Sequence, residues 1–211
     1  MKGLIVSSGT ITDYSRLESI VKQVDFIICA DGGMNHLIKI NRKPDLVIGD
    51  LDSINQISLE YIKDNDIPVK KYPSIKDATD TGLAMEYLID KGCKEIVLMG
   101  VTGTRQDHTM ANILLLNVLY DKGIKGKIVD DNNIIYLTDG HLELPRLENH
   151  YISIIPIVEE GINISLNGFF YNLDNEFIKF GSTYGISNEI VDSVGIIKIH
   201  NGRALVFVSK D

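Results

Sequence analysis

The sequence is poor in cysteine and in basic residues. Its 211 residues include two cysteines, Cys29 and Cys93, each beside apolar residues of strand-like character. We therefore expect buried free thiols and a reducing cytosol, not a disulfide or a zinc site. Lys and Arg number 21 against 29 Asp and Glu, which gives a net charge of -8. This balance argues against nucleic acid or an anionic membrane as the main partner, because both bind clustered positive charge.

Signal, membrane-spanning and common nucleotide-binding patterns are also missing. The apolar start, residues 1–6, passes directly into Ser7-Ser8-Gly9 and is too short for a secretory signal. No other apolar stretch approaches the length of a membrane span, so we predict a cytoplasmic protein. The sequence has neither a G-x-x-x-x-G-K-[ST] phosphate loop nor a G-x-G-x-x-G fingerprint. The commonest nucleotide-binding designs are therefore excluded.

Hydrophobic residues make up 44% of the chain, and their pattern in the first half alternates between two periods. Short apolar runs, typical of buried strands, occupy residues 4–6, 26–29, 46–48 and 95–99. Between them, apolar residues recur at helical spacing over 17–24, 83–88 and 113–119. This alternation predicts an α/β domain over residues 1–126, with a mostly parallel sheet covered on both faces.

The second half of the chain has a different hydrophobic pattern. Helical periodicity gives way to short β-rich segments at 127–129, 134–137, 151–155, 162–166, 196–199 and 204–208. Such segments favour an antiparallel sandwich or barrel, and the fold that we predict for residues 127–211 is an all-β sandwich. The first of these segments has an alternative place in the α/β sheet.

An acidic pair follows the apolar run at 46–48. In Gly49-Asp50-Leu51-Asp52-Ser53, an extended chain would present Asp50 and Asp52 on the same side. Two such carboxylates repel each other and favour a hard cation between them, for which Mg²⁺ is suited. The alternative is a solvated acidic turn, since Asp, Gly and Ser are common turn residues.

Further polar clusters follow other predicted strands or precede predicted helices. They are Asp31-Gly32-Gly33, Asp77-Ala78-Thr79-Asp80-Thr81 and the segment 100–108. Each has a structural alternative: Asp31 in a tight turn, Asp77 or Thr79 as a helix N-cap, and Asp107 beside a helix dipole. His108 is a candidate base, metal ligand or polar contact at a helix start. Their convergence favours a ligand site, because open α/β sheets bind ligands beyond the carboxyl ends of their strands.

The chemistry of these clusters indicates a metal-phosphate ligand. Glycines allow backbone amides to approach phosphate oxygens, and Arg105 offers a planar fork to a phosphate group. The carboxylates supply oxygen ligands for a cation that would accompany the phosphates.

Taken in order, these motifs resemble those of the thiamine pyrophosphokinase family in its bacterial form. The resemblance rests on Asp31-Gly32-Gly33, residues 49–53, residues 77–80, residues 103–108 and Gly185-Ile186-Ser187-Asn188-Glu189, which together span nearly the whole chain. The chain departs from the family pattern at Thr104, where a glycine is usual, and at Gly82, where bacterial members often carry an acid. The Cβ atom of Thr104 restricts the approach of the backbone to a phosphate.

The resemblance implies a function and a set of site residues. It implies transfer of a diphosphate from ATP to the hydroxyl of thiamine, with an α/β domain that binds ATP and Mg²⁺ and a β-sandwich that binds thiamine. It further implies a homodimer paired through the β-domains, with composite active sites. The implied Mg²⁺ ligands are Asp50, Asp52 and Asp80, with Asp31 a further candidate, and the implied catalytic residues are Asp80, Asp52 and Arg105. The implied contacts to ATP or thiamine are Asp31, Gly32, Gly33, Asp77, Thr79, Gly103, Asp107, His108, Ser187 and Asn188.

Two other functions fit the same residues. A metal-dependent phosphohydrolase would deliver water, in place of an alcohol, to the same metal-phosphate site. A non-catalytic sensor of nucleotide or thiamine would need fewer aligned groups than a transferase. Formation of AMP from ATP that depends on thiamine distinguishes the three.

Overall fold

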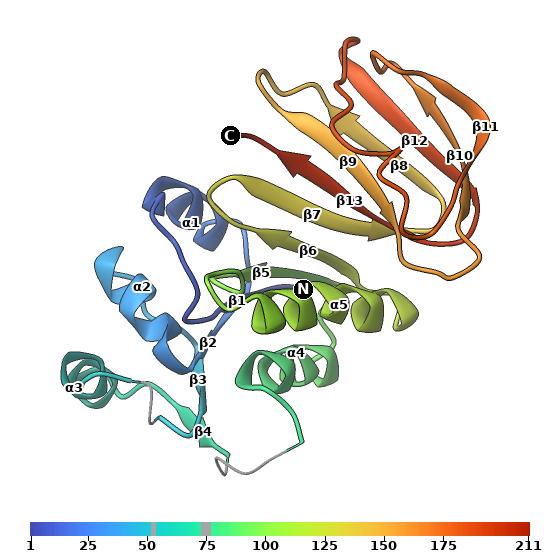
Figure 1. Cartoon of the computed structure of the whole chain (residues 1–211). Helices are drawn as coiled ribbons and strands as arrows, with labels where there is room; N and C mark the ends of the chain where they lie inside the picture. The colour runs from blue at the N-terminus through green and yellow to red at the C-terminus, as the bar shows by residue number, and fades with distance from the viewer. Residues whose placement is uncertain (52–53, 73–76) are drawn as a thin grey trace. The chain divides into compact units, whose positions relative to one another are not determined.

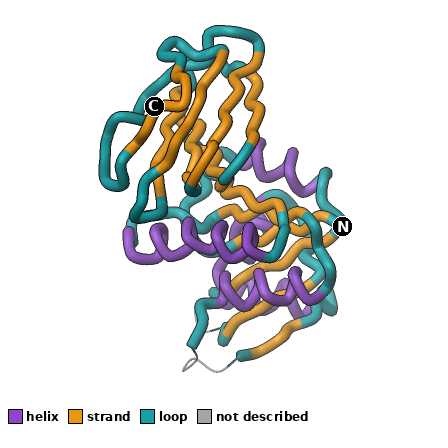
Figure 2. The backbone as a smooth tube through the Cα atoms, turned by 90° about the vertical axis from the view of Figure 1, so that its right-hand side faces the viewer, coloured by secondary structure: helices purple, strands orange, loops and turns teal. Residues whose placement is uncertain are grey.

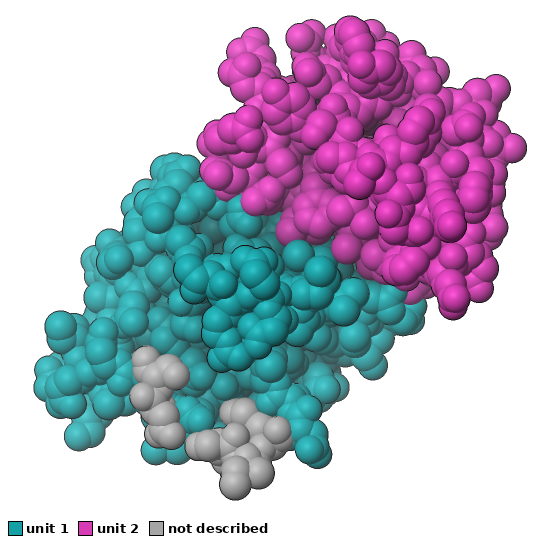
Figure 3. Space-filling view, in the orientation of Figure 1, with its two compact units in different colours: residues 1–131 teal, residues 132–211 magenta. Residues whose placement is uncertain are grey.

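A computed structural model describes residues 1–51, 54–72 and 77–211, so Asp52 lies outside the described residues. The chain forms two compact units, residues 1–131 (unit 1) and 132–211 (unit 2), which Figure 3 colours separately. Unit 1 contains α-helices and a parallel sheet, and unit 2 is built from antiparallel strands. The predicted fold class is confirmed.

Unit 1 contains a parallel sheet in the order β4-β3-β2-β1-β5-β6. Its strands are β1 (Lys2–Val6), β2 (Phe26–Ala30), β3 (Leu46–Gly49), β4 (Val69–Lys71), β5 (Glu95–Met99) and β6 (Lys125–Val129). The central strands are buried along nearly their whole length, which explains their continuous apolar runs. Since β6 pairs in parallel with β5, the first β-rich segment after residue 125 belongs to this sheet. The predicted division at 126/127 falls within β6.

Helices cover both faces of this sheet. They are α1 (Tyr14–Val21), α2 (Met34–Lys39), α3 (Gln56–Asp64), α4 (Asp80–Asp90) and α5 (Gln106–Asp121), with a short 3-10 turn, η1 (Asp31–Gly33), after β2. Figure 1 shows α1 to α3 on one side of the sheet and α4 and α5 on the other, and Figure 2 shows the same layers in purple and orange. The periodicity did not predict α2 or α3, which are short, nor the three-residue strand β4.

The strand order places a crevice at one edge of the sheet. From β1 the chain proceeds to β2, β3 and β4 on one side and then crosses to β5 on the other. The connections after β1 and β5 therefore lead to helices on opposite faces of the sheet, and open α/β sheets bind ligands beyond the strand ends at such a switch in strand order. Among the described residues, no helix has both the length and the apolar character that a membrane span requires.

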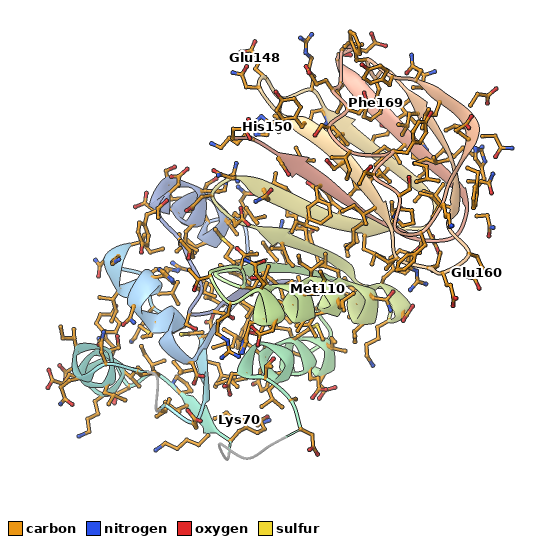
Figure 4. The ribbon with its side chains drawn as sticks, viewed as in Figure 1. Lys70, Met110, Glu148, His150, Glu160 and Phe169 are labelled. Carbon is orange, nitrogen blue, oxygen red and sulfur yellow. The ribbon has the colours of Figure 1, made fainter. Side chains whose placement is uncertain are left out.

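Unit 2 is a sandwich of two antiparallel layers. Its strands are β7 (Asn133–Thr138), β8 (His141–Pro145), β9 (Tyr151–Pro156), β10 (Ile162–Asn167), β11 (Leu173–Ile178), β12 (Val194–Asn201) and β13 (Ala204–Ser209). Strand β13 pairs with β7 and β9, while the other layer has the order β11-β10-β12-β8. Inward-facing side chains from both layers enclose Phe169, labelled in Figure 4. Strand β11 was not predicted, because Asp174-Asn175-Glu176 at its centre removes the apolar signal.

Candidate active site

A cavity of about 620 Å³ opens in unit 1 at the carboxyl ends of β1, β2 and β5. Three loop regions and the first turns of α4 and α5 form its wall. The lining residues are 7–10, 30–31, 78–81, 100–105, His108, Thr109 and Asn112. The cavity therefore lies where the strand order opens the crevice.

Two loops of the cavity wall are joined by backbone hydrogen bonds. Beyond the end of the β1–β5 pairing, the amide of Gly9 donates to the carbonyl of Gly100 at 2.6 Å, and that of Thr10 donates to Thr102 at 2.9 Å. A Cβ atom on Gly9 would lie 2.3 Å from the Thr102 carbonyl oxygen, so this close approach requires glycine. The wall between β1 and β5 is thus continuous backbone.

The first turn of α4 brings a carboxylate to the cavity. Thr79 is the N-cap of this helix, and its hydroxyl accepts a hydrogen bond from the Gly82 amide at 3.2 Å, which confirms the capping alternative for Thr79. Asp80 follows as the first helical residue and lines the cavity, where its charge also favours the helix N-terminus. A buried hydrogen bond of 2.9 Å between the hydroxyls of Thr81 and Ser7 ties α4 to the end of β1.

Two more carboxylates begin the neighbouring connections after β2 and β3. Asp31 lines the cavity with a φ of 46°, and its Oδ1 atom lies 1.9 Å from where a Cβ atom on Gly49 would be. Asp50 follows Gly49, the last residue of β3. Leu51 has a φ of 70°, so the extended geometry that we assumed for residues 49–53 does not hold at Leu51.

These carboxylates fit a hard cation by the chemistry of their donor atoms. Asp31 and Asp80 line one cavity, and both offer the oxygen ligands that Mg²⁺ prefers. Among residues 1–51, 54–72 and 77–211, no three His, Cys, Asp or Glu side chains form a group that could hold a metal. Asp52, the remaining predicted ligand, lies outside those ranges.

Arg105 and Asp107 form a two-point ion pair at the start of α5. The Nη2 atom of Arg105 lies 2.7 Å from Oδ2 of Asp107, and its Nε donates to Oδ1 at 3.3 Å. The hydrogen bond from Arg105 lowers the pKa of Asp107 to about 2. Both side chains are about two-thirds exposed, so water screens the pair, and its effect is to restrict the orientation of the guanidinium. His108 lines the cavity one residue further along the helix.

Several cavity residues were not predicted from the sequence. The hydroxyl residues Ser8 and Thr10 line the wall, as does Asn112, whose Nδ2 atom donates to the Val101 carbonyl at 2.8 Å. The sequence context of Ser8 and Thr10 could have identified them. Ser7-Ser8-Gly9-Thr10 directly follows an apolar run, the same context that identified Asp31-Gly32-Gly33.

The remaining predicted contacts, Ser187 and Asn188, belong to unit 2. Asn188 borders a second cavity of about 230 Å³, whose other lining residues are Ile154, Leu166, Tyr171, Leu173, Ile178, Tyr184, Gly185 and Ile186. The Asn188 side chain is buried and bonds to backbone: Nδ2 donates to the Tyr171 carbonyl at 2.8 Å, and Oδ1 accepts from the Tyr171 amide at 3.1 Å. Ser187 is exposed, with a φ of 59°. Asn188 therefore shapes the cavity wall, and a direct ligand contact by either residue stays a prediction.

Comparison with known proteins gives matches over both units. The model of the family described as "Thiamin pyrophosphokinase, catalytic domain" matches residues 17–128, and that of "Thiamin pyrophosphokinase, vitamin B1 binding domain" matches residues 140–206. The thiamine pyrophosphokinase of Bacillus subtilis (strain 168) is 34% identical over 186 residues, which cover 87% of each chain. Thiamin pyrophosphokinase 1 of Caenorhabditis elegans is 27% identical over 203 residues, 92% of this chain and 82% of the relative.

Two solved structures have the same fold over their whole length. The crystal structure of thiamine pyrophosphokinase from Bacillus subtilis gives a TM-score of 0.90 at 31% identity and covers 100% of both chains. That of thiamin pyrophosphokinase from Geobacillus thermodenitrificans gives 0.86 at 28% identity, covering 100% of this chain and 98% of the other.

Proposed function

The chain belongs to the thiamin pyrophosphokinase family, and we propose that the cavity of unit 1 is where it carries out that family's reaction. The enzyme makes thiamine diphosphate from thiamine and ATP, and AMP is the other product. One observation supports this site above all: the catalytic-domain match at 17–128 contains the cavity residues Asp31, Asp80 and Arg105, which arrive from three separate connections.

The residues of unit 1 have distinct roles in this proposal. Arg105, oriented by Asp107, contacts the phosphates of ATP, while Gly32, Gly33 and Gly103 and the side chains of Asp77, Thr79 and His108 complete the nucleotide site. Asp80 orients the thiamine hydroxyl toward the β-phosphorus, because transfer requires the attacking oxygen in line with the leaving group. Orientation outweighs proton abstraction at Asp80, since a carboxylate beside a cation is a weak base.

Mg²⁺ is the cofactor that we infer from the carboxylates. Asp50, Asp52 and Asp80 would hold it, with Asp31 as a neighbouring oxygen donor. When bound, the ion neutralises charge that develops on the phosphoryl oxygens. The residues of the chain position ATP and thiamine and exclude competing water.

In this proposal, unit 2 binds thiamine and forms the dimer interface. The vitamin B1 binding match at 140–206 contains every residue of the second cavity, whose apolar wall suits an aromatic ring. Ser187, exposed beside it, would bond the polar edge of the thiamine pyrimidine. The two compact units divide after residue 131, a few residues beyond the 126/127 boundary that the sequence pattern suggested, and we place the function in the cytoplasm.

Exposed aromatic residues on unit 2 support a homodimer. Phe170, Tyr171, Phe177, Phe180 and Tyr184 are each at least half exposed, within one segment of the chain. Monomeric soluble proteins rarely leave so many large apolar groups in water, because burying each one is favourable. A two-fold pairing would cover the same surface on each subunit and create two equivalent composite sites, each with Asp80 from one chain and Ser187 from the other.

The test of the function is AMP formation from ATP with and without thiamine. Product identification by ³¹P NMR should show thiamine diphosphate and AMP in equal amounts only when both substrates are present. Consumption of ATP without thiamine would identify a phosphohydrolase. Binding without consumption of either compound would identify a sensor.

A further inference from the structure

His36, on α2, reaches the cavity wall through a single hydrogen bond. Its Nε2 atom lies 2.8 Å from the carbonyl oxygen of Gly9, in the loop that lines the cavity after β1. A carbonyl oxygen only accepts, so Nε2 carries the proton. The two residues are 27 positions apart in sequence and meet because α2 packs beside the end of β1.

The other ring nitrogen of His36 is held as well. Nδ1 lies 2.9 Å from the hydroxyl oxygen of Tyr14, which in turn accepts a hydrogen bond from Nζ of Lys39 at 3.0 Å. The lysine is the donor at one end and the Gly9 carbonyl is the acceptor at the other. Lys39 therefore donates to Tyr14, Tyr14 to Nδ1 of His36, and Nε2 of His36 to Gly9. This chain selects the neutral ring with its proton on Nε2. Burial lowers the pKa of His36, and the charge of Lys39 acts in the same direction, against the opposing effects of the Gly9 hydrogen bond and Asp131.

The hydrogen bond from His36 holds the carbonyl group of the Gly9–Thr10 peptide. The amide of Thr10 in this peptide already donates to Thr102, and the amide of Gly9 donates to Gly100. With its carbonyl also held, the peptide cannot rotate, and the side chains of Ser8 and Thr10 stay at the cavity surface. The other end of the loop is held by Asp131, which accepts hydrogen bonds from the amides of Thr12 and Asp13.

We propose that His36 is a positioning residue for nucleotide binding: through Gly9 it holds the Ser7–Thr10 loop in the shape that contacts ATP. This inference rests on the proposed function of the cavity. It requires no contact between His36 and the substrate. The role depends on donation from Nε2, so a side chain that keeps a donor there should preserve it, and an apolar one should not.

The test compares His36→Leu with His36→Gln, whose side-chain amide can donate from nearly the same place. We expect His36→Leu to raise the KM for ATP about tenfold, the order expected for one lost hydrogen bond, with the KM for thiamine unchanged. His36→Gln should recover most of that loss. His141→Leu, at an exposed histidine on β8, is the matched control and should change neither constant.

Melting temperatures separate positioning from general support of the fold. If His36→Leu lowers the melting temperature while the KM for ATP stays at the wild-type value, or if His36→Gln is as impaired in KM as His36→Leu, the proposal is overturned. If the wild type forms no AMP, the proposed function is wrong, independently of the role of His36. The positioning role is then decided by calorimetric titration with ATP, in which His36→Leu must bind about tenfold more weakly than wild type.

Discussion

The hydroxyl groups of Ser7 and Thr81 lie 2.9 Å apart in the buried wall of the cavity, and they join the end of β1 to the first turn of α4. The two residues are 74 positions apart in sequence. Each also lies at a part of the wall with a proposed role: Ser7 begins the Ser7–Thr10 loop, for which we propose a contact with ATP, and Thr81 follows Asp80. The bond therefore couples the geometry of the nucleotide wall to that of the carboxylate.

Removing one of these hydroxyls should destabilise the protein. Ser7→Ala leaves the Thr81 hydroxyl buried without its partner, at a cost of about 1 to 3 kcal/mol in the free energy of unfolding. The double variant with Thr81→Val should cost less than the sum of the two single changes, because the second change removes the unsatisfied group. Urea unfolding measures all three, with Thr183→Val as an exposed control. Additive costs would show that the two hydroxyls do not interact.

Asp80→Asn should abolish diphosphate transfer with little loss of folded protein. The side chain reaches the cavity, and site carboxylates that repel one another do not supply much stability. Loss of the negative charge in the first turn of α4 should cost no more than about 1 kcal/mol. Asp52→Asn is expected to act in the same way on transfer. Activity and melting temperature are measured together, with Glu86→Gln, exposed on the same helix, as the control. A parallel fall in both quantities would indicate a structural role for these acids.

Arg105→Lys should weaken the use of ATP while leaving thiamine binding largely intact. The substitution keeps the positive charge but removes the planar fork that Arg105 presents, here braced by Asp107. We expect a rise in the KM for ATP of about tenfold, equivalent to one charge-assisted hydrogen bond. Steady-state kinetics with each substrate varied in turn make the measurement. A collapse of thiamine affinity with a normal KM for ATP would contradict the proposed division between the two units.

Asp107 should titrate far below the physiological range. Its folded pKa of about 2 lies below the ordinary 3.8, so its stabilising effect is fully present above pH 3.8 and is lost as the pH falls through 2. The Arg105–Asp107 pair is therefore intact throughout the range of neutral pH. Carboxyl ¹³C NMR should give a midpoint near 2 in the wild type, and Arg105→Ala should move it upward toward 3.8. An unmoved midpoint would mean that another group depresses this pKa.

Composite sites predict complementation between two inactive chains. One chain carries Asp80→Asn, and the other carries Ile186→Lys with Ser187→Ala, which places a positive charge at the second cavity to repel the thiazolium of thiamine. Under random pairing, half of the dimers have one intact site in two, so activity should return to roughly a quarter of wild type. Two affinity tags isolate the mixed dimers, which should show about half of the wild-type activity in the assay. Mixed dimers that remain inactive would mean that each site is built from a single chain.

Much of the architecture follows from the sequence alone. The buried runs at 4–6, 26–29 and 95–99 became β1, β2 and β5, because strands covered on both faces carry continuous apolar residues. Cys29 and Cys93 are buried and free, as their apolar neighbours indicated. The capping role of Thr79 is equally local, since a cap needs only the residues of the next turn. The family, too, was recognised from motifs in their order along the chain.

Only the tertiary structure decided which distant groups meet. Strand order brings Ser7 to Thr81 and His36 to Gly9. The periodicity of apolar residues does not predict these pairs, because it indicates which face of an element is buried but not which residue packs against it. The family resemblance implies that Asn188 contacts thiamine, and the fold adds that its side-chain amide bonds to the backbone of Tyr171. Leu51 turns the chain out of extended geometry just beyond β3, a choice of φ that residue type alone did not specify. The sequence thus determined the elements and the chemistry, while packing determined which side chains act on the cavity and which only hold its walls.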